Sequence, residues 1–277
     1  MTVHTRRPRP SARPRRSRKG RVPMFAVAGG VAVVALLASG CGARASDDAS
    51  PDHRSFALQG NTLTIDSDDS ALELVSADVD QVKVTRWFQG SVAIGSDPKV
   101  TWSMKDDRLT LRLHCSGVFA DCSAKHRVEV PRDVAVNLKN RDGSVRASGF
   151  STALTLRTGD GSVRVQDSTG RLEMHSGDGS LHASDVRSRQ ISADTRDGSI
   201  RLELATVPDR VDVSSHDGSV TVDLPRSGSV NGSATAYRVT AKTHDGGVDV
   251  SVPRDDRSPH VVTAESRDGK VTVRNAN

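Results

Sequence analysis

Apolar and polar residues alternate along most of the chain from residue 55 onward. Between residues 55 and 136 the alternation is seen in pairs such as Leu63 and Ile65, or Val128 and Val130. An alternation of period two is the pattern of β-strands that bury one face. Clusters of turn-forming residues, such as residues 66–69, separate these runs. The pattern therefore predicts an N-terminal β-strand region over residues 55–136.

Over residues 137–277 the alternation becomes a repeat. Each unit has the pattern of a strand, an Asp-Gly pair and a second strand, as in LTLRTGDGSVRV and VDVSSHDGSVTV. The Asp-Gly pair recurs at intervals of 18, 18, 19, 20, 28 and 23 residues. A fixed period of about 20 residues indicates a solenoid whose coils stack on one another. The predicted repeat turns are Asp142 and Gly143, Asp160 and Gly161, Asp178 and Gly179, Asp197 and Gly198, Asp217 and Gly218, Asp245 and Gly246, and Asp268 and Gly269.

Stacked coils, about 4.8 Å apart, would align equivalent apolar residues into two ladders. One ladder is expected to contain Leu154, Leu172, Ile191, Val211, Val239 and Val261, and the other Val145, Val163, Leu181, Ile200, Val220, Val248 and Val271. Each buried Val or Leu contributes about 1.5–3 kcal/mol, so the ladders can stabilise a fold that is poor in aromatic residues. The fold class predicted is all-β, a single-stranded β-helix or β-solenoid over residues 137–277. The longest interval predicts a loop protruding at residues 225–236, and Gly269 is expected in the terminal coil.

The Asp-Gly pairs are first of all corners of the coil. Glycine tolerates the positive φ of tight turns, and aspartate can hydrogen-bond the backbone of its own turn. Seven carboxylates in register could also offer oxygen ligands to Ca²⁺, but each turn supplies only one aspartate. His216 and His244 precede aspartates in consecutive repeats and are expected to lie close together, although two histidines make a poor metal site. We therefore predict no metal and no cofactor.

The first 40 residues have the pattern of a targeting segment. Nine Lys or Arg residues lie between Arg6 and Arg21, and residues 24–40 then contain no charge. The sequence Leu-Ala-Ser-Gly-Cys at residues 37–41 resembles a bacterial lipobox, which would make Cys41 the lipidation site; an uncleaved signal anchor is the alternative. Residues 41–54 are small and polar, as expected of a flexible tether. The protein is thus expected to be exported and anchored to the outer face of the cell membrane.

Removing the signal changes the charge balance. Nine of the 39 basic residues lie in the first 40 residues, which leaves 30 against 34 acidic residues and a net charge of −4. The high isoelectric point therefore belongs to the precursor. A basic stripe interleaved with aromatic residues is absent from the sequence after residue 40, so nucleic acid is not an expected partner.

The two remaining cysteines, Cys115 and Cys122, form a natural pair in an oxidising compartment. A bridge between them would close a loop of eight residues, worth about 2.5 kcal/mol in the chain-entropy model. Two free thiols are the alternative.

Motifs of common enzymes are not found in the sequence, including the G-x-S-x-G elbow, H-E-x-x-H and the P-loop. Some β-helix proteins cleave polysaccharides, and an enzyme of that kind is the alternative function. Such enzymes usually bind sugar rings on aromatic platforms, whereas this chain has five Phe, two Trp and one Tyr. The sequence favours a protein that is not an enzyme.

The lipobox-like segment and the repeated Thr/Ser-x-Asp-Gly-Ser-Val pattern together resemble the DUF4097 family of proposed adhesins, in its actinobacterial lipoprotein-like form. The resemblance covers residues 55–275 and implies an all-β, solenoid-like surface protein. The family brings no established catalytic residues. We therefore expect a binding, adhesion or envelope scaffold module, held to the membrane by a lipid anchor, whose partner is a cell-wall polymer or another envelope protein.

Overall fold

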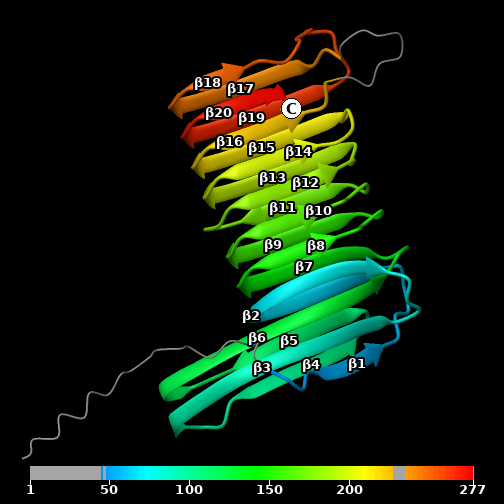
Figure 1. Cartoon of the computed structure of the whole chain (residues 1–277), viewed down its shortest axis with the longest axis vertical. Helices are drawn as coiled ribbons and strands as arrows, with labels where there is room; N and C mark the ends of the chain where they lie inside the picture. Colours follow the sequence, from blue (N-terminus) through cyan, green and yellow to red (C-terminus); the bar gives the residue numbers. More distant parts are fainter. Residues whose placement is uncertain (1–44, 46–47, 227–234, 277) are drawn as a thin grey trace, which may run out of the picture. The chain divides into compact units, whose positions relative to one another are not determined.

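The structure is a computed structural model that describes residue 45, residues 48–226 and residues 235–276 (Figure 1). These residues form β-strands and no α-helix. Among them, no helix is long and apolar enough to cross a membrane. The predicted targeting segment and Cys41 lie outside the described residues.

The strands wind into stacked coils, which confirms the predicted β-solenoid (Figure 1). In one coil, β9 (Leu154–Asp160) precedes the Asp-Gly corner and β10 (Val163–Gln166) follows it. Both strands pair in parallel with the equivalent strands of the neighbouring coils, so that β9 lies between β7 and β11. Strands that precede the corners form what we call the first sheet, and strands that follow them form the second sheet. The other strands of the Asp-Gly coils are β7 (Ala135–Asp142), β8 (Val145–Ser148), β11 (Leu172–Ser176), β12 (Leu181–Val186), β13 (Gln190–Asp197), β14 (Ile200–Leu204), β15 (Arg210–Asp217), β16 (Val220–Leu224), β17 (Arg238–Asp245), β18 (Val248–Val250), β19 (Val261–Asp268) and β20 (Val271–Asn275).

The parallel stacking begins before residue 137, the boundary expected from the sequence. β2 (Thr62–Ala77) is a complete coil, because its first half pairs in parallel with β7 and its second half with β8. β5 (Arg108–His114) and β6 (Gly117–Pro131) pair in parallel with the two halves of β2. The long alternating segments thus belong to the same column as the Asp-Gly repeats.

Antiparallel strands cover the N-terminal end of this column. β3 (Val82–Gly95) pairs with β6, and β4 (Lys99–Lys105) pairs with β5. β1 (Asp52–Phe56) pairs with β3, so residues 52–54 belong to the folded region and not to the tether. These antiparallel strands cover the edges of the N-terminal coil, which would otherwise be open to pairing with another chain.

The order of the last two coils in space is the reverse of their order in the sequence. β15 pairs with β19, and β19 in turn pairs with β17. In the second sheet, β20 likewise lies between β16 and β18. The expectation that Gly269 lies in the terminal coil is therefore wrong, because that coil contains Gly246. The loop predicted at residues 225–236 lies largely outside the described residues, which leave out residues 227–234.

The interior of the column is filled by the two predicted ladders, with one correction. Val211 and Val239 both align with Val262, which is fully buried, and not with Val261. Val261 instead aligns with Arg210 and Arg238, one position along the strand. The second ladder follows the predicted residues, although Val248 in the terminal coil is 48% exposed because no further coil covers it.

The corner glycines are required for a reason other than the one the sequence suggested. Of the seven, Gly143 and Gly246 have positive φ, at 123° and 157°, and the other five do not. A Cβ atom at Gly179 would lie 2.3 Å from the carbonyl oxygen of Gly161 in the preceding coil. The same contact, at 2.2–2.4 Å, recurs at Gly161, Gly198 and Gly218. Glycine is needed because the corners stack backbone on backbone, and the positive-φ prediction for Gly161, Gly179, Gly198 and Gly218 is wrong.

Two residues before every Asp-Gly pair except the first, which has Asn140 there, stands a Ser or Thr that completes this stacking. Its hydroxyl donates to the glycine carbonyl of the preceding coil, as Thr195 Oγ1 does to Gly179 at 2.9 Å and Ser215 Oγ does to Gly198 at 2.9 Å. Thr158 is the exception, since its buried hydroxyl has no hydrogen-bond partner among the described residues. Buried carbonyl groups without a donor destabilise a fold, which explains why the repeat carries a hydroxyl at this position.

Thr195→Val is expected to lower the free energy of unfolding by about 1–2 kcal/mol, because the Gly179 carbonyl loses its donor while the shape of the side chain is kept. Thr158→Val is the matched control and is expected to change it by less than about 0.5 kcal/mol. Urea unfolding of the two variants measures both values. Equal losses in the two variants would show that the hydroxyl ladder does not stabilise the stack.

Candidate functional site

The aspartates of the corners form a row along one edge of the column. Asp142 aligns with Asp160, Asp197 with Asp217, and Asp245 with Asp268. Asp69 of β2 extends the row, because it aligns with Asp142. Burial and the neighbouring Asp142 carboxyl group together raise the pKa of Asp69. The carboxylates are therefore close enough to influence one another, as expected for successive coils.

Cationic side chains offset part of this negative charge. Arg196 forms ion pairs with Asp178 of the preceding coil and with Asp197 of its own coil. Arg141 contacts Asp68 at 3.2 Å. Arg267 instead bonds to His216, with Nη1 and Nε2 2.8 Å apart. The row is thus tolerated by ordinary ion pairing, which agrees with a structural role for these aspartates.

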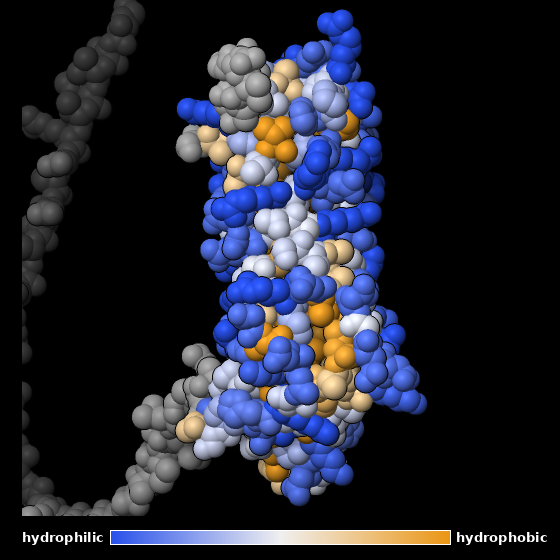
Figure 2. Space-filling view, turned by 90° about the vertical axis from the view of Figure 1, so that its right-hand side faces the viewer, coloured by the Kyte–Doolittle hydropathy of each residue, from blue (hydrophilic) through white to orange (hydrophobic). Residues whose placement is uncertain are grey.

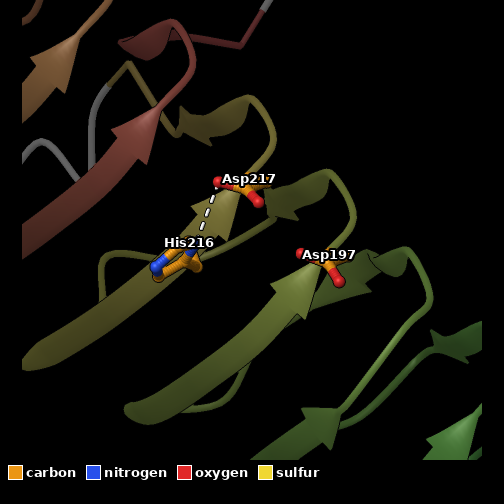
Figure 3. A group of neighbouring side chains, drawn as sticks. All are labelled: Asp197, His216 and Asp217. Atoms are coloured by element: carbon orange, nitrogen blue, oxygen red, sulfur yellow. Dashed lines mark hydrogen bonds and ion pairs between the residues drawn. The ribbon is translucent and has the colours of Figure 1, made fainter.

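Asp197, His216 and Asp217 form the one group of three metal-binding side chains found among the described residues (Figure 3). Their ligand atoms lie within 4.8 Å of one another, and all three residues are exposed. His216 Nδ1 bonds to the Asp217 carboxylate at 2.8 Å, while Nε2 accepts the hydrogen bond from Arg267. The ring therefore uses both nitrogens in these contacts. This bond to His216 also contributes most to lowering the pKa of Asp217.

His244 does not join this group. Because the last two coils are reversed, the strand that carries Arg267 lies between the strands that carry His216 and His244. The expectation that the two histidines lie in adjacent coils is wrong. With one histidine and two exposed carboxylates, the group is an ordinary surface cluster of hydrogen bonds and ion pairs.

The outer face of the first sheet balances its charges from coil to coil. Arg157 of β9 pairs with Glu173 of β11, and His175 of β11 contacts Asp194 of β13 at 2.9 Å. Ser214 of β15 donates to the same Asp194 carboxylate. Charged groups on this face are therefore largely satisfied by their neighbours.

The outer face of the second sheet differs over three successive coils. Arg146 of β8 aligns with Arg164 of β10, and Arg164 aligns with His182 of β12. The outward positions on both sides of these residues are uncharged, so β8 and β10 carry no acidic residue. We call this surface the cationic face; it consists of Ser144, Arg146, Ser148, Ser162, Arg164, Gln166, Ser180, His182 and Ser184.

Two of the three basic side chains of the cationic face, those of Arg164 and His182, have no acidic partner within the described part of the chain. Arg164 is exposed, and neither it nor His182 has an ion pair or a side-chain hydrogen bond there. Arg146 aligns with Glu73 of β2, whose carboxylate is bonded to Lys125 at 3.0 Å and to Arg127 at 2.5 Å. Burial alone would raise the pKa of Glu73. The positive charges of Lys125, Arg127 and Arg146 outweigh this effect and lower the pKa. Glu73 is thus already satisfied at one end of the face.

Two shallow depressions lie on the cationic face. One, of about 160 Å³, is lined by Arg146, Arg164, His182 and the serines that follow the corner glycines. The other, of about 140 Å³, lies between Arg146, Arg164 and Glu73. Figure 2 shows one side of the column, where hydrophilic side chains cover most of the surface and apolar patches are limited in extent.

Sequence reasoning missed this face although it had a signal. Arg146, Arg164, His182 and Arg201 each follow the aspartate of their own corner by four residues. Stacking in register places residues of equal offset side by side, so a row of cations could have been predicted. Arg201 differs from the others, because it pairs with Glu203 at 2.7 Å and Asp223 at 3.2 Å. The position four residues after the corner aspartate does not by itself reveal which basic side chains have an acidic partner.

Cys115 and Cys122 are disulfide-bonded in the structure, with Cα atoms 6.3 Å apart. The bridge lies near the tip formed by the ends of β3 and β6, where Ile94 pairs with Val118. Ile94, Val118 and Phe119 are exposed at this tip.

The Asp-Gly repeats match a known family model. Residues 121–251, from β6 to just beyond β18, match the family model Toastrack DUF4097. The resemblance predicted from the Asp-Gly repeats is confirmed. No curated protein matches the chain.

Solved structures also resemble this chain at low sequence identity. A proposed adhesin from Bacteroides fragilis is 14% identical, with a TM-score of 0.40, over 85% of this chain and 100% of the other. A proposed cell adhesion protein from Clostridium sporogenes is 12% identical, with a TM-score of 0.35, over 82% and 100% of the two chains. A proposed adhesin from Parabacteroides merdae is 11% identical, with a TM-score of 0.36, over 83% and 98%.

Proposed function

We propose that this protein is an exported, membrane-anchored binding module that contacts a repetitive component of the cell envelope. The observation that carries the proposal is the cationic face, where basic side chains and hydroxyl groups lie in register over three coils. A stack of coils presents the same chemical groups at a regular spacing, which suits a ligand that is itself a repeating polymer.

Binding, and not catalysis, is also favoured by the chemistry of the described surface. The depressions are shallow and are lined by polar and charged side chains from successive coils, including Arg, Ser, Thr, Asp, Glu and His. Among the described residues, one cluster has side chains of the kind that bind metals, namely Asp197, His216 and Asp217. Both ring nitrogens of His216 are already bonded, to Asp217 and Arg267. Cleavage of a polysaccharide remains the competing function, and it is distinguished by its products.

A sedimentation experiment tests the proposed function. The full chain, purified in detergent, is mixed with isolated cell envelopes, and the bound fraction is measured after centrifugation. We expect saturable binding that survives proteolytic removal of envelope proteins, with no release of soluble sugar. Binding that is lost after proteolysis would indicate a protein partner, sugar release would indicate the enzyme, and no binding would contradict the proposal.

Anchoring through Cys41 is a separate prediction. If the lipobox-like segment is processed, lipidation of Cys41 supplies the anchor after cleavage. Cys41→Ala should then release the protein into the medium or leave it unprocessed, and fractionation with intact mass measurement detects both. A mutant that stays in the membrane at the same mass as the wild-type protein would indicate an uncleaved signal anchor.

A further inference from the structure

We infer that the cationic face binds a linear phosphodiester polymer that lacks bases. This inference rests on the proposed function and names the ligand class for it. The residues that would carry the interaction are Arg146, Arg164 and His182, with the serines at positions 144, 162 and 180 beside them. None of the comparisons or motifs assigns a ligand to these residues.

The local charge of the cationic face favours an anionic ligand. The chain after residue 40 has a net charge of −4, so a local group of basic side chains without bonded acidic partners stands out against an acidic background. On the opposite sheet, Arg157 and His175 also lie at outward positions but are paired with Glu173 and Asp194. Oppositely charged side chains on neighbouring coils can therefore form ion pairs in this fold. The cationic face is therefore complementary to an anionic partner from outside the described chain.

The regular spacing of the coils favours a ligand with repeated phosphate groups. Arg146, Arg164 and His182 lie on three successive coils about 4.8 Å apart, so this row of basic side chains extends over about 10 Å. Guanidinium groups bind phosphate through parallel N–H···O bonds, and serine hydroxyls can donate to the remaining phosphate oxygens. The depression between Arg146, Arg164 and the adjacent serines places both kinds of donor around one space. A chain of regularly spaced phosphates could follow the row from one coil to the next.

The absence of aromatic residues from this face selects among phosphodiester polymers. Its nine residues are Ser, Arg, Gln and His, so it offers no Phe, Tyr or Trp on which bases could stack. Proteins that bind single-stranded nucleic acid combine a basic groove with such stacking platforms. A polymer of phosphodiester-linked alcohols, recognised by its backbone alone, fits the observed surface better than RNA or DNA.

The experiment uses the full chain in detergent and fluorescently labelled poly(glycerol phosphate) as the probe, with anisotropy as the readout. We expect binding that weakens roughly sevenfold between 50 and 200 mM salt, as two guanidinium–phosphate contacts predict. The double variant Arg146→Gln with Arg164→Gln should bind at least tenfold more weakly and lose most of this salt dependence. Ser162→Asp, which adds a carboxylate at the centre of the face, should weaken binding in the same way.

Arg157→Gln is the matched control, because it removes an exposed arginine from the first sheet at a comparable height in the stack. We expect it to bind within twofold of the wild-type protein. Equal losses in Arg157→Gln and the double variant, or none in either, would overturn the inference. Tighter binding of single-stranded DNA than of poly(glycerol phosphate) would overturn the ligand class. A protein that sediments with envelopes but ignores poly(glycerol phosphate) refutes this inference alone, whereas one that does neither also refutes the proposed function.

Discussion

Gly179→Val is expected to lower the free energy of unfolding by about 3 kcal/mol or more, as forced overpacking of a rigid interior does at its upper end. A Cβ atom at this position would lie 2.3 Å from the oxygen and 2.5 Å from the carbon of the Gly161 carbonyl group. The obstacle is backbone, so no rotation of a side chain can relieve it. Relief requires the two coils to move apart, which breaks hydrogen bonds and exposes both apolar ladders.

Two further substitutions make this prediction specific. Gly246→Val has a similar contact, 2.3 Å from the Gly269 oxygen, but it lies in the terminal coil, which can separate without disturbing a second interface. The part of its cost that comes from separating coils should therefore be smaller than for Gly179→Val, while the positive φ of Gly246 adds backbone strain of its own. Ser180→Ala, on an exposed position next to Gly179, should change stability by less than about 0.5 kcal/mol. Urea unfolding gives the order, and a Gly179 variant as stable as Ser180→Ala would contradict the close stacking of the corners.

The second large effect is a loss of stability in mild acid caused by His126. This residue of β6 is completely buried, and neither ring nitrogen has a hydrogen-bond partner among the described residues. Its neighbours include Trp102, with ring centroids 6.4 Å apart, and the Arg86 guanidinium stacks on that Trp102 ring. Burial, followed by the positive charge of Arg86, lowers the pKa of His126 to about 4.

The direction of the effect follows from the two pKa values. An unfolded chain has a histidine pKa near 6.5, so below that pH the unfolded state binds a proton that the folded state does not. Stability from the neutral, buried His126 is present above about pH 6.5 and is lost as the pH falls toward 4. Between pH 7 and pH 4.5 the loss should be about 2 kcal/mol.

His126→Leu should remove this part of the pH dependence, because leucine cannot take up a proton. Denaturant unfolding of both proteins at pH 7 and pH 4.5 measures the difference. A His126→Leu variant that loses as much stability as the wild-type protein would show that other groups cause the acid sensitivity. Carboxylates such as Glu73, whose pKa is lowered, lose their contribution at still lower pH, below their usual range near 4.5.

The sequence predicted the elements of this fold well because each coil repeats one local pattern. Alternation identified the buried residues, and the Asp-Gly pairs identified the corners that bring the two strands of a coil together. The role of Gly179 could not be predicted in detail, since a turn with positive φ and a close backbone contact both require glycine. Only the stacked neighbour shows which of the two applies.

The order of the last coils could not be predicted for a related reason. The sequence pattern alone allows β15 to pair with β17 or with β19, because both carry the same alternation of apolar residues and the same corner. Only the observed pairing of β15 with β19 shows which order is adopted. The cationic face was similarly hidden: the offset of Arg146 and Arg164 was readable, but the lack of acidic partners became clear only when the strands were placed side by side.

The reversed order of these coils sets a condition on how the column assembles. β17 pairs with β19 and β18 with β20, so in this arrangement residues 238–250 have no place on the stack until residues 261–275 have docked on β15 and β16. A solenoid in sequential order could add coils one at a time from its N-terminal end. Here the addition must pause after β16 until about 50 further residues are available. The end of the column is therefore closed in a single late event, and its edge strands stay unpaired until residues 261–275 have docked.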